Sequence, residues 1–192
     1  MLRVLTVLLP LFLFSGCIHD ISTAPELSKI PKERPVTIKR SVAYYLPPKL
    51  YELSVTTPGG NNDELRYSPY KETEPALKKV LENVFTEVHR IDSLNDKKIK
   101  EHDIQFIFVP KIETMSYSNS NVDWEPTKFN FVLKVMFYRA DKTPFYESYS
   151  QGKGVANFGR YQDNPDYAVE IATRSAFLQF QDEIITKRTL FK

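Results

Sequence analysis

Histidine and serine side chains are the first candidates for chemistry in this 192-residue chain, and their spacing forms no catalytic or metal-binding pattern. The three histidines are His19, His89 and His102, and no two of them show the short spacing of paired metal ligands, such as H-x-x-x-H. His102 and Asp103 lie in a charged run, which favours a solvated loop over a metal site or a proton shuttle. No serine lies in the G-x-S-x-G pattern that exposes a nucleophile. The sequence therefore predicts no metal site and no cofactor.

Two further patterns suggest enzymes and are better explained without one. Glu113, Asp123 and Glu125 lie close in sequence and suggest a glycosidase, but such an enzyme needs two carboxylates about 5 to 10 Å apart in a cleft. Nothing in the sequence indicates a cleft, so we interpret the three acids as surface charge. The glycine-rich stretch GKGVANFGR, residues 152–160, does not fit G-x-x-x-x-G-K-[ST] and follows a strand pattern without opening into a helix. We therefore expect no enzymatic activity.

The only cysteine, Cys17, ends the segment with the clearest chemical meaning. Arg3 is the only charge before an apolar run over residues 4–14, which has the length of a secretory signal core. The run is too short to cross about 30 Å of hydrocarbon, which takes roughly 20 apolar residues. The small residues Ser15 and Gly16 come next, and the ending FSGC resembles the bacterial lipobox. In that motif the cysteine thiol is diacylated and the cysteine becomes the mature N-terminus.

The sequence thus predicts a lipoprotein signal peptide over residues 1–16 and a lipid anchor on Cys17. Phe14 departs from the pattern, because leucine is usual three residues before the cysteine. The alternatives are a simple secretory signal with an unrelated cysteine, or a buried core helix. A lone cysteine in an exported protein needs a reason, and lipidation supplies one. Ile18 follows the cysteine where aspartate would retain a lipoprotein in the inner membrane, so we expect the outer membrane, with the chain facing the periplasm.

The composition is that of one folded domain with no affinity for nucleic acid. The chain carries 26 basic and 24 acidic side chains, so it lacks the basic footprint of a nucleic-acid-binding protein. With 42% hydrophobic and 13% aromatic residues it is able to bury a core. Three prolines and no hydrophobic period over residues 17–35 predict a lipidated, semi-rigid tether. A single domain then follows over residues 36–192.

The first half of this domain predicts two strands and a helix. Apolar and polar residues alternate over residues 36–46 and again over 51–57, as in half-buried strands, with a proline pair between them. The first helix is predicted over residues 73–92, where apolar side chains recur at helical spacing opposite charged ones. Thr73 and Pro75 are typical of a helix start.

The second half predicts three strands, over residues 104–112, 129–137 and 145–155. The alternation is almost without fault in the middle strand. Gly152 and Gly154 share one face of the last strand, which indicates the close approach of a neighbouring element.

A second helix is predicted over residues 163–187, where the small residues Ala168, Ala172 and Ala176 would let it sit close to the sheet. The order of elements is then ββαβββα. Runs of strands separated by single helices predict an α+β fold, with a mainly antiparallel sheet of about five strands and two helices on one face.

The chain resembles small outer-membrane lipoproteins of the YajG family and, more distantly, LptE-like lipoproteins and the N-terminal domain of TolB. The matching features are FSGC, the helix EPALKKVLENVF, the hairpin FNFVLKVMFYRADKTPFYESYSQGKGVA and the terminal helix DYAVEIATRSAFLQF. The match is one of pattern and order, so no functional residue is carried over. The resemblance implies an assembly or scaffold role, because members of these groups mostly act in that way.

The best candidates for function are binding surfaces. The polar loop 117–126 holds Trp124, and the loop 158–167 holds Arg160 and Tyr161. Trp, Tyr and Arg dominate interface energetics when they pack in pockets, although Trp124 could equally pack on its own core. The open sheet face around Tyr138 is the third candidate. We expect a non-enzymatic, membrane-anchored lipoprotein that binds an envelope protein, and the alternative is a module that binds glycan or lipid.

Overall fold

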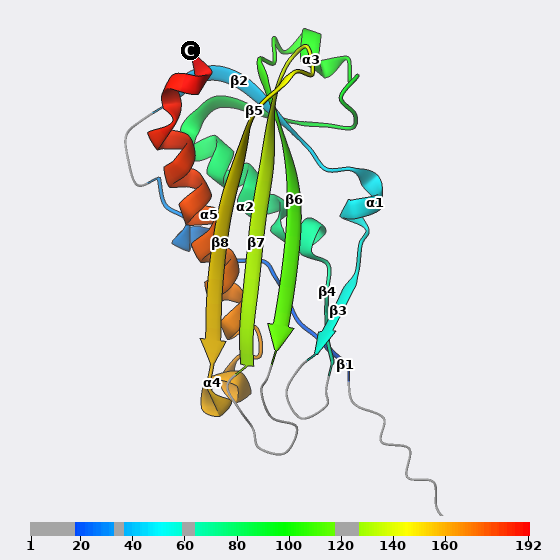
Figure 1. Cartoon of the computed structure of the whole chain (residues 1–192), viewed down its shortest axis with the longest axis vertical. Helices are drawn as coiled ribbons and strands as arrows, with labels where there is room; N and C mark the ends of the chain where they lie inside the picture. The colour runs from blue at the N-terminus through cyan, green and yellow to red at the C-terminus, as the bar shows by residue number, and fades with distance from the viewer. Residues whose placement is uncertain (1–17, 33–36, 59–63, 118–126) are drawn as a thin grey trace, which may run out of the picture.

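The computed structural model describes residues 18–32, 37–58, 64–117 and 127–192, without the side chains of residues 127, 158 and 162. The main sheet has five strands in the order β5-β2-β6-β7-β8 (Figure 1). Its strands are β2 (Ile38–Tyr45), β5 (Phe85–Ile91), β6 (Phe106–Tyr117), β7 (Thr127–Arg139) and β8 (Pro144–Ala156). β6, β7 and β8 are antiparallel neighbours, whereas β2 runs parallel to both β5 and β6.

A second sheet of three strands lies beside one end of the main sheet (Figure 1). Its strands, in spatial order, are β1 (Ile18–Asp20), β4 (Glu64–Tyr67) and β3 (Val55–Pro58). The hydroxyl of Ser116 in β6 donates to Thr57 Oγ1 at 2.7 Å and also contacts the carbonyl oxygen of Pro58. These bonds join β3 to the end of β6, so the two sheets share one end of the molecule.

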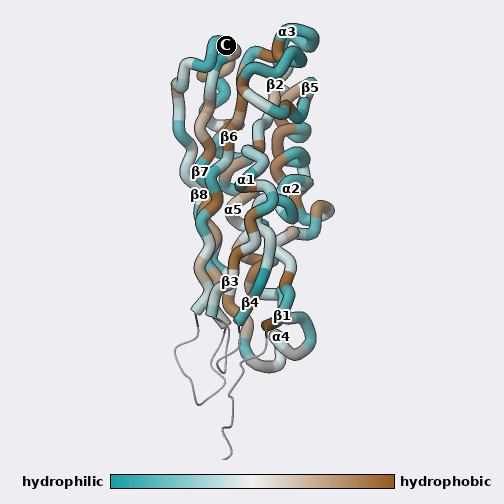
Figure 2. The backbone as a smooth tube through the Cα atoms, turned by 90° about the vertical axis from the view of Figure 1, so that its right-hand side faces the viewer, coloured by the Kyte–Doolittle hydropathy of each residue, from teal (hydrophilic) through white to brown (hydrophobic). Residues whose placement is uncertain are grey.

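Two long helices, α2 (Pro69–Val84) and α5 (Tyr167–Thr186), pack on one face of the main sheet (Figures 1 and 2). The short helices are α1 (Pro48–Tyr51), α3 (Lys98–Glu101), α4 (Phe158–Asp163), η1 (Leu27–Lys29) and η2 (Arg188–Phe191). The predicted α+β fold class is confirmed, with the refinement that β2 makes the sheet mixed. No helix within the described ranges is both long and apolar enough to cross a membrane.

The core lies between the sheet and the two helices, and strand β7 supplies its centre. The predicted alternation is confirmed, because every second side chain of β7 from Phe129 to Phe137 is buried. These side chains are Phe129, Phe131, Leu133, Val135 and Phe137. Aromatic rings join them to the neighbouring strand, as between Phe108 and Phe137, whose centroids are 4.7 Å apart.

Helix α5 lies against the backbone of β8, as the glycines predict. A Cβ atom added at Gly152 would lie 1.8 Å from the carbonyl oxygen of Ala172, and one added at Gly154 would lie 1.7 Å from that of Ala168. Only a residue without a side chain leaves room for this contact. The small residues on both elements therefore fix the distance between the helix and the sheet.

The predicted helix over 73–92 is wrong at both ends. Helix α2 begins at Pro69, and the chain passes directly from its last residue, Val84, into strand β5. Val88 and Ile91 fit helical spacing in the sequence, but β5 pairs in parallel with β2 from Ile38 onward. Pairing with a neighbouring strand outweighs local helical spacing here, because it completes one edge of the sheet.

Residues 18–32 pack against the domain, whereas the sequence predicted an extended tether. Ile21 and Ile30 are buried, and the backbone N–H and hydroxyl of Thr23 both donate to Glu72 Oε2 at 2.7 Å. The side chain of Asn83 donates to the carbonyl oxygen of Ile30 at 3.2 Å. The segment stays attached because these contacts bury its apolar side chains and satisfy its backbone.

Two predictions at strand and loop positions also need correction. The predicted strand over 51–57 starts only at Val55, because residues 48–51 form helix α1 after the first proline of a pair. The predicted loop 158–167 contains helix α4, which Asn157 caps by accepting a bond from the backbone N–H of Arg160 at 3.0 Å.

Candidate functional site

The main sheet has a second face, which points away from α2 and α5 and which we call the outer face. On β6, β7 and β8 the strand register arranges its side chains in rows across the three strands. Starting from the end shared with the small sheet, the rows are Tyr117–Lys128–Val155, Met115–Asn130–Lys153, Glu113–Val132–Gln151 and Lys111–Lys134–Tyr149. Antiparallel pairing holds these side chains on a continuous hydrogen-bonded surface.

The other end of this face is covered by the chain between β5 and β6. Leu94, Ile99 and Ile104 from this segment pack around Ala43 and Ile107 of the sheet in a small second core. Tyr45 and Tyr138 lie at the edge of the same cluster and are half-buried. The expectation of an open face around Tyr138 is therefore wrong, because residues 94–104 cover that part of the sheet.

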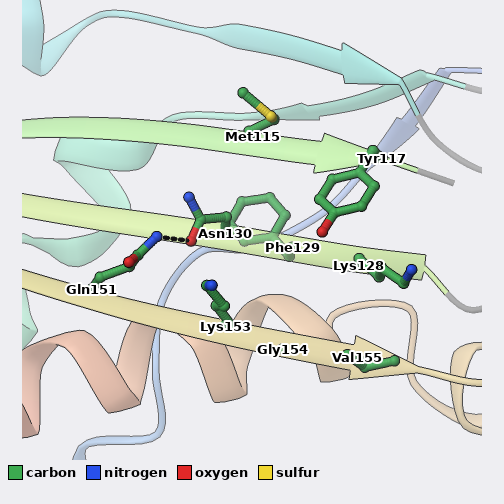
Figure 3. A pocket seen from close by; sticks show the side chains of 9 residues that line it. All are labelled: Met115, Tyr117, Lys128, Phe129, Asn130, Gln151, Lys153, Gly154 and Val155. Atoms are coloured by element: carbon green, nitrogen blue, oxygen red, sulfur yellow. Dashed lines mark hydrogen bonds between the residues drawn. The ribbon is translucent and has the colours of Figure 1, made fainter.

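The uncovered rows expose large apolar side chains. The exposed fractions are 59% for Met115, 57% for Tyr149 and 53% for Val155. Met115, Tyr117 and Val155 also line an open depression of about 460 Å³ near the end of the three strands. Figure 3 shows Met115, Asn130, Lys153 and Val155 standing on this side of the ribbon, with Phe129 behind it in the core.

Contacts between neighbouring side chains hold the polar part of the depression in place. Gln151 Nε2 donates to Asn130 Oδ1 at 2.7 Å, across β7 and β8 (Figure 3). The ammonium nitrogen of Lys128 lies 5.5 Å from the centre of the Tyr117 ring, a cation–π distance. Lys153 forms no ion pair within the described part of the chain. The depression therefore combines apolar surface, an amide pair and positive charge.

Farther along the outer face, one glutamate lies between two lysines. Lys134 Nζ lies 3.0 Å from Glu113 Oε1, and Lys111 Nζ lies 3.1 Å from the same oxygen. Hydrogen bonds from Lys134 and then Lys111 hold the pKa of the Glu113 carboxyl below its usual value. The two rows beside the depression hold Lys128 and Lys153 and no acidic side chain, so the excess positive charge of these four rows is largest there.

Three of the residues predicted as binding candidates, Tyr138, Arg160 and Tyr161, are described, and the structure does not bring all three together. Trp124 and Cys17 lie outside the described residues. Tyr161 is only 8% exposed and belongs to the main core. Arg160 is exposed on α4, with its guanidinium carbon 5.4 Å from the centre of the Tyr167 ring. Because Tyr138 lies at the opposite end of β7 from α4, it forms no common patch with Arg160 and Tyr161.

The structure also brings together two histidines that lie apart in the sequence. The rings of His89 and His102 are stacked, with centroids 4.2 Å apart and planes inclined by 20°. His89 lies on strand β5 rather than on the predicted helix. Among the residues that the structure describes, no group of three or more His, Cys, Asp and Glu side chains could hold a metal ion.

Met115, Tyr149, Gln151 and Lys153 were missed as site residues, although the sequence holds a signal for three of them. Tyr149, Gln151 and Lys153 have the opposite parity to Gly152, which predicts that they face away from α5. Met115 could not be found in this way, because the predicted strand stopped at residue 112 whereas β6 extends to Tyr117.

No family model matches the chain, and no curated protein matches it in sequence. Among solved structures it is similar to protein XCC0632 of Xanthomonas campestris, of the family DUF330. The TM-score is 0.51 and the identity 10%, over 92% of this chain and 96% of that one. It is also similar to a homologue of a neuraminyllactose-binding hemagglutinin from Helicobacter pylori. Here the TM-score is 0.47 and the identity 12%, over 84% and 94% of the two chains. The first likeness shows that another bacterial protein shares the fold; the resemblance to the YajG family stays a prediction.

Proposed function

We propose that the chain is a non-enzymatic lipoprotein of the bacterial envelope. In this proposal a lipid on Cys17 anchors it to the outer membrane, and the domain binds an envelope protein on the outer face of β6, β7 and β8. The observation that supports the binding role is the exposure of Met115 and Tyr149, each more than half exposed, on a regular sheet surface. Met115 also lines one depression together with the exposed Tyr117 and Val155, and apolar side chains grouped in this way are typical of interaction surfaces.

A protein partner fits this surface better than a small ligand does. Small molecules are usually held in concave, mostly enclosed pockets, whereas the side chains of this face stand exposed on three adjacent strands. Strand pairing fixes the backbone of this surface, so no loop has to be ordered when a partner binds. Aromatic and methionine side chains are enriched at protein interfaces, and this face exposes Met115, Tyr117 and Tyr149.

One observation favours a glycan as the second candidate. The hydrogen-bonded amides of Asn130 and Gln151 line the same depression as Tyr117 and Lys153. Each amide has further donor or acceptor capacity that could bind sugar hydroxyls, and aromatic rings stack on sugars. A glycan would use this depression alone, whereas a protein would extend to Tyr149.

The partner surface is tested by adding a negative charge at two of its exposed apolar positions. A Met115→Asp and Tyr149→Asp double variant is expected to lose its envelope partner in affinity purification, because burying two carboxylates without partners is costly. Both side chains are exposed, so the thermal midpoint should change little. Leu53→Asp is the matched control, since Leu53 is a 40% exposed apolar residue outside this face. Equal partner recovery from the double variant, the control and the wild type would refute the proposal.

The anchor is tested separately. Cys17→Ser is expected to release the protein from the membrane fraction or to leave its signal peptide uncleaved, because serine offers no thiol for acylation. Several acyl chains each contribute about 0.8 kcal/mol per buried CH₂, so their loss should be visible in simple fractionation. If the variant matured normally and still fractionated with the membrane, Cys17 would not be the anchor.

A further inference from the structure

The position of Ile18 determines how far from the membrane an anchored domain would stand. Ile18 is the first described residue and is already part of β1, where it pairs with Glu64 of β4. The segment that follows is held on the domain by the contacts of Thr23 and Ile30. Cys17 is therefore joined by a single peptide bond to a strand of the fold, and adjacent Cα atoms are only about 3.8 Å apart.

The end of the molecule that carries Ile18 is a continuous row of strand ends. Ile18 pairs with Glu64, which pairs with Pro58, and Pro58 contacts Ser116. Tyr117 is the next residue of β6, and the row continues through the pairs Tyr117–Lys128 and Lys128–Val155. We call Ile18, Tyr117, Lys128 and Val155 the anchor end.

The anchor end has the side chains that suit a bilayer surface. Ile18 is 52% exposed, Tyr117 44% and Val155 53%. Tyrosine is enriched at membrane interfaces, and a lysine there keeps its ammonium group in water while its stem covers apolar surface. Charges of both signs lie at this end: Glu64 is in the same row as Lys128, and Asp20 is paired with Arg66 at 2.7 Å. We therefore expect docking to depend on the apolar side chains and not on electrostatic attraction to anionic lipids.

We infer that the anchor end docks directly on the bilayer surface, so that the lipoprotein holds one fixed orientation in which β6, β7 and β8 extend away from the membrane and Tyr149 lies farther from it than Tyr117 does. The inference rests on the lipid anchor of the proposed function and adds the contact that orients the domain. The anchor holds Ile18 at the membrane, so the contacts of Tyr117 and Val155 form at a high effective concentration. A flexible tether would give no such orientation.

The test uses the full lipidated protein in vesicles of phosphatidylethanolamine and phosphatidylglycerol. The sulfur of an acylated Cys17 does not react, so Val155→Cys provides the only free thiol for an environment-sensitive fluorophore. Lys97→Cys is the matched control, because its side chain is 84% exposed and lies next to α3, at the opposite end of the molecule (Figure 1). We expect a blue shift and strong quenching by nitroxide-labelled lipid for the label at 155, at low and high salt, and neither effect for the label at 97.

Two outcomes would overturn the inference while leaving the anchor intact. If the vesicle-bound protein gave the same aqueous signal from both labels, the domain would stand free of the membrane. If both labels were quenched, the domain would lie in another orientation. Protein that failed to bind vesicles at all would instead refute the lipid anchor, and with it the membrane part of the proposed function. Partner binding is not involved, because the vesicles contain no other protein.

Discussion

Gly152→Ala is expected to unfold the domain or to destabilise it by at least about 3 kcal/mol, at the upper end of the range for overpacked cores. The new methyl carbon would lie 1.8 Å from the carbonyl oxygen of Ala172 and 3.0 Å from the backbone nitrogen of Ala176. Neither atom is the flexible end of a side chain, so helix α5 as a whole would have to move from the sheet. The measurement is the free energy of unfolding in urea, with circular dichroism to establish whether the variant folds.

Gly159→Ala is the control for this substitution. Gly159 lies in the short helix α4, and among the described side chains an added Cβ would meet only that of Asn157, at 4.0 Å. The change should be neutral or should stabilise the protein by up to about 1 kcal/mol, because alanine has the higher helix propensity. A Gly152→Ala variant as stable as the Gly159→Ala variant would show that α5 does not pack on β8 in this way.

Phe131→Ala is expected to cost about 3 to 5 kcal/mol, as other truncations of buried phenylalanines do. Phe131 is fully buried in the middle of β7, with its ring 6.0 Å from that of Phe177 on α5. Removing the ring loses the burial of its apolar surface and leaves a cavity between sheet and helix. The free energy of unfolding in urea measures the loss, and the near-ultraviolet circular dichroism should weaken with it.

Asn130→Ala tests the register of the same strand from its other face. Asn130 points to the outer face, where its only described bond is the one from Gln151. Losing one partly exposed hydrogen bond should cost under about 1 kcal/mol. Equal losses for Phe131→Ala and Asn130→Ala would contradict the assigned register.

The parts of the fold that follow from side-chain periodicity could be predicted from the sequence. The alternation over residues 129–137 placed β7 correctly, because a strand buried on one face leaves a period of two. Gly152 and Gly154 predicted the close packing of α5, because glycine in a strand interior often marks the place where another backbone approaches closely.

The parts that depend on distant pairing could not be predicted. The spacing of Val84, Val88 and Ile91 fits a helix, and only the neighbouring β2 makes residues 85–91 a strand. The proline-rich segment 18–32 has no hydrophobic period, and its attachment depends on Glu72 and Asn83, which lie about fifty positions away in the chain.

The sequence predicted which face of the sheet carries the candidate site, but not where on that face the site lies. The sequence showed that one sheet face is free of the two helices, yet it favoured Tyr138 as the centre of that face. Tyr138 is half-buried because Leu94 and Ile99 come from a segment with little periodicity and cover it. The open part lies toward the other end of the strands, around Met115 and Tyr149.

Site-specific photo-crosslinking in intact cells tests the binding role of the outer face most directly. A photoreactive residue at Tyr149 is compared with one at Lys78, whose side chain is 52% exposed on α2, on the opposite side of the sheet. We predict a discrete crosslinked product with an envelope protein from position 149 and none from position 78, and the Met115→Asp substitution should abolish it. A product of equal yield from both positions, or one from position 78 alone, would contradict the assignment of the outer face as the binding surface.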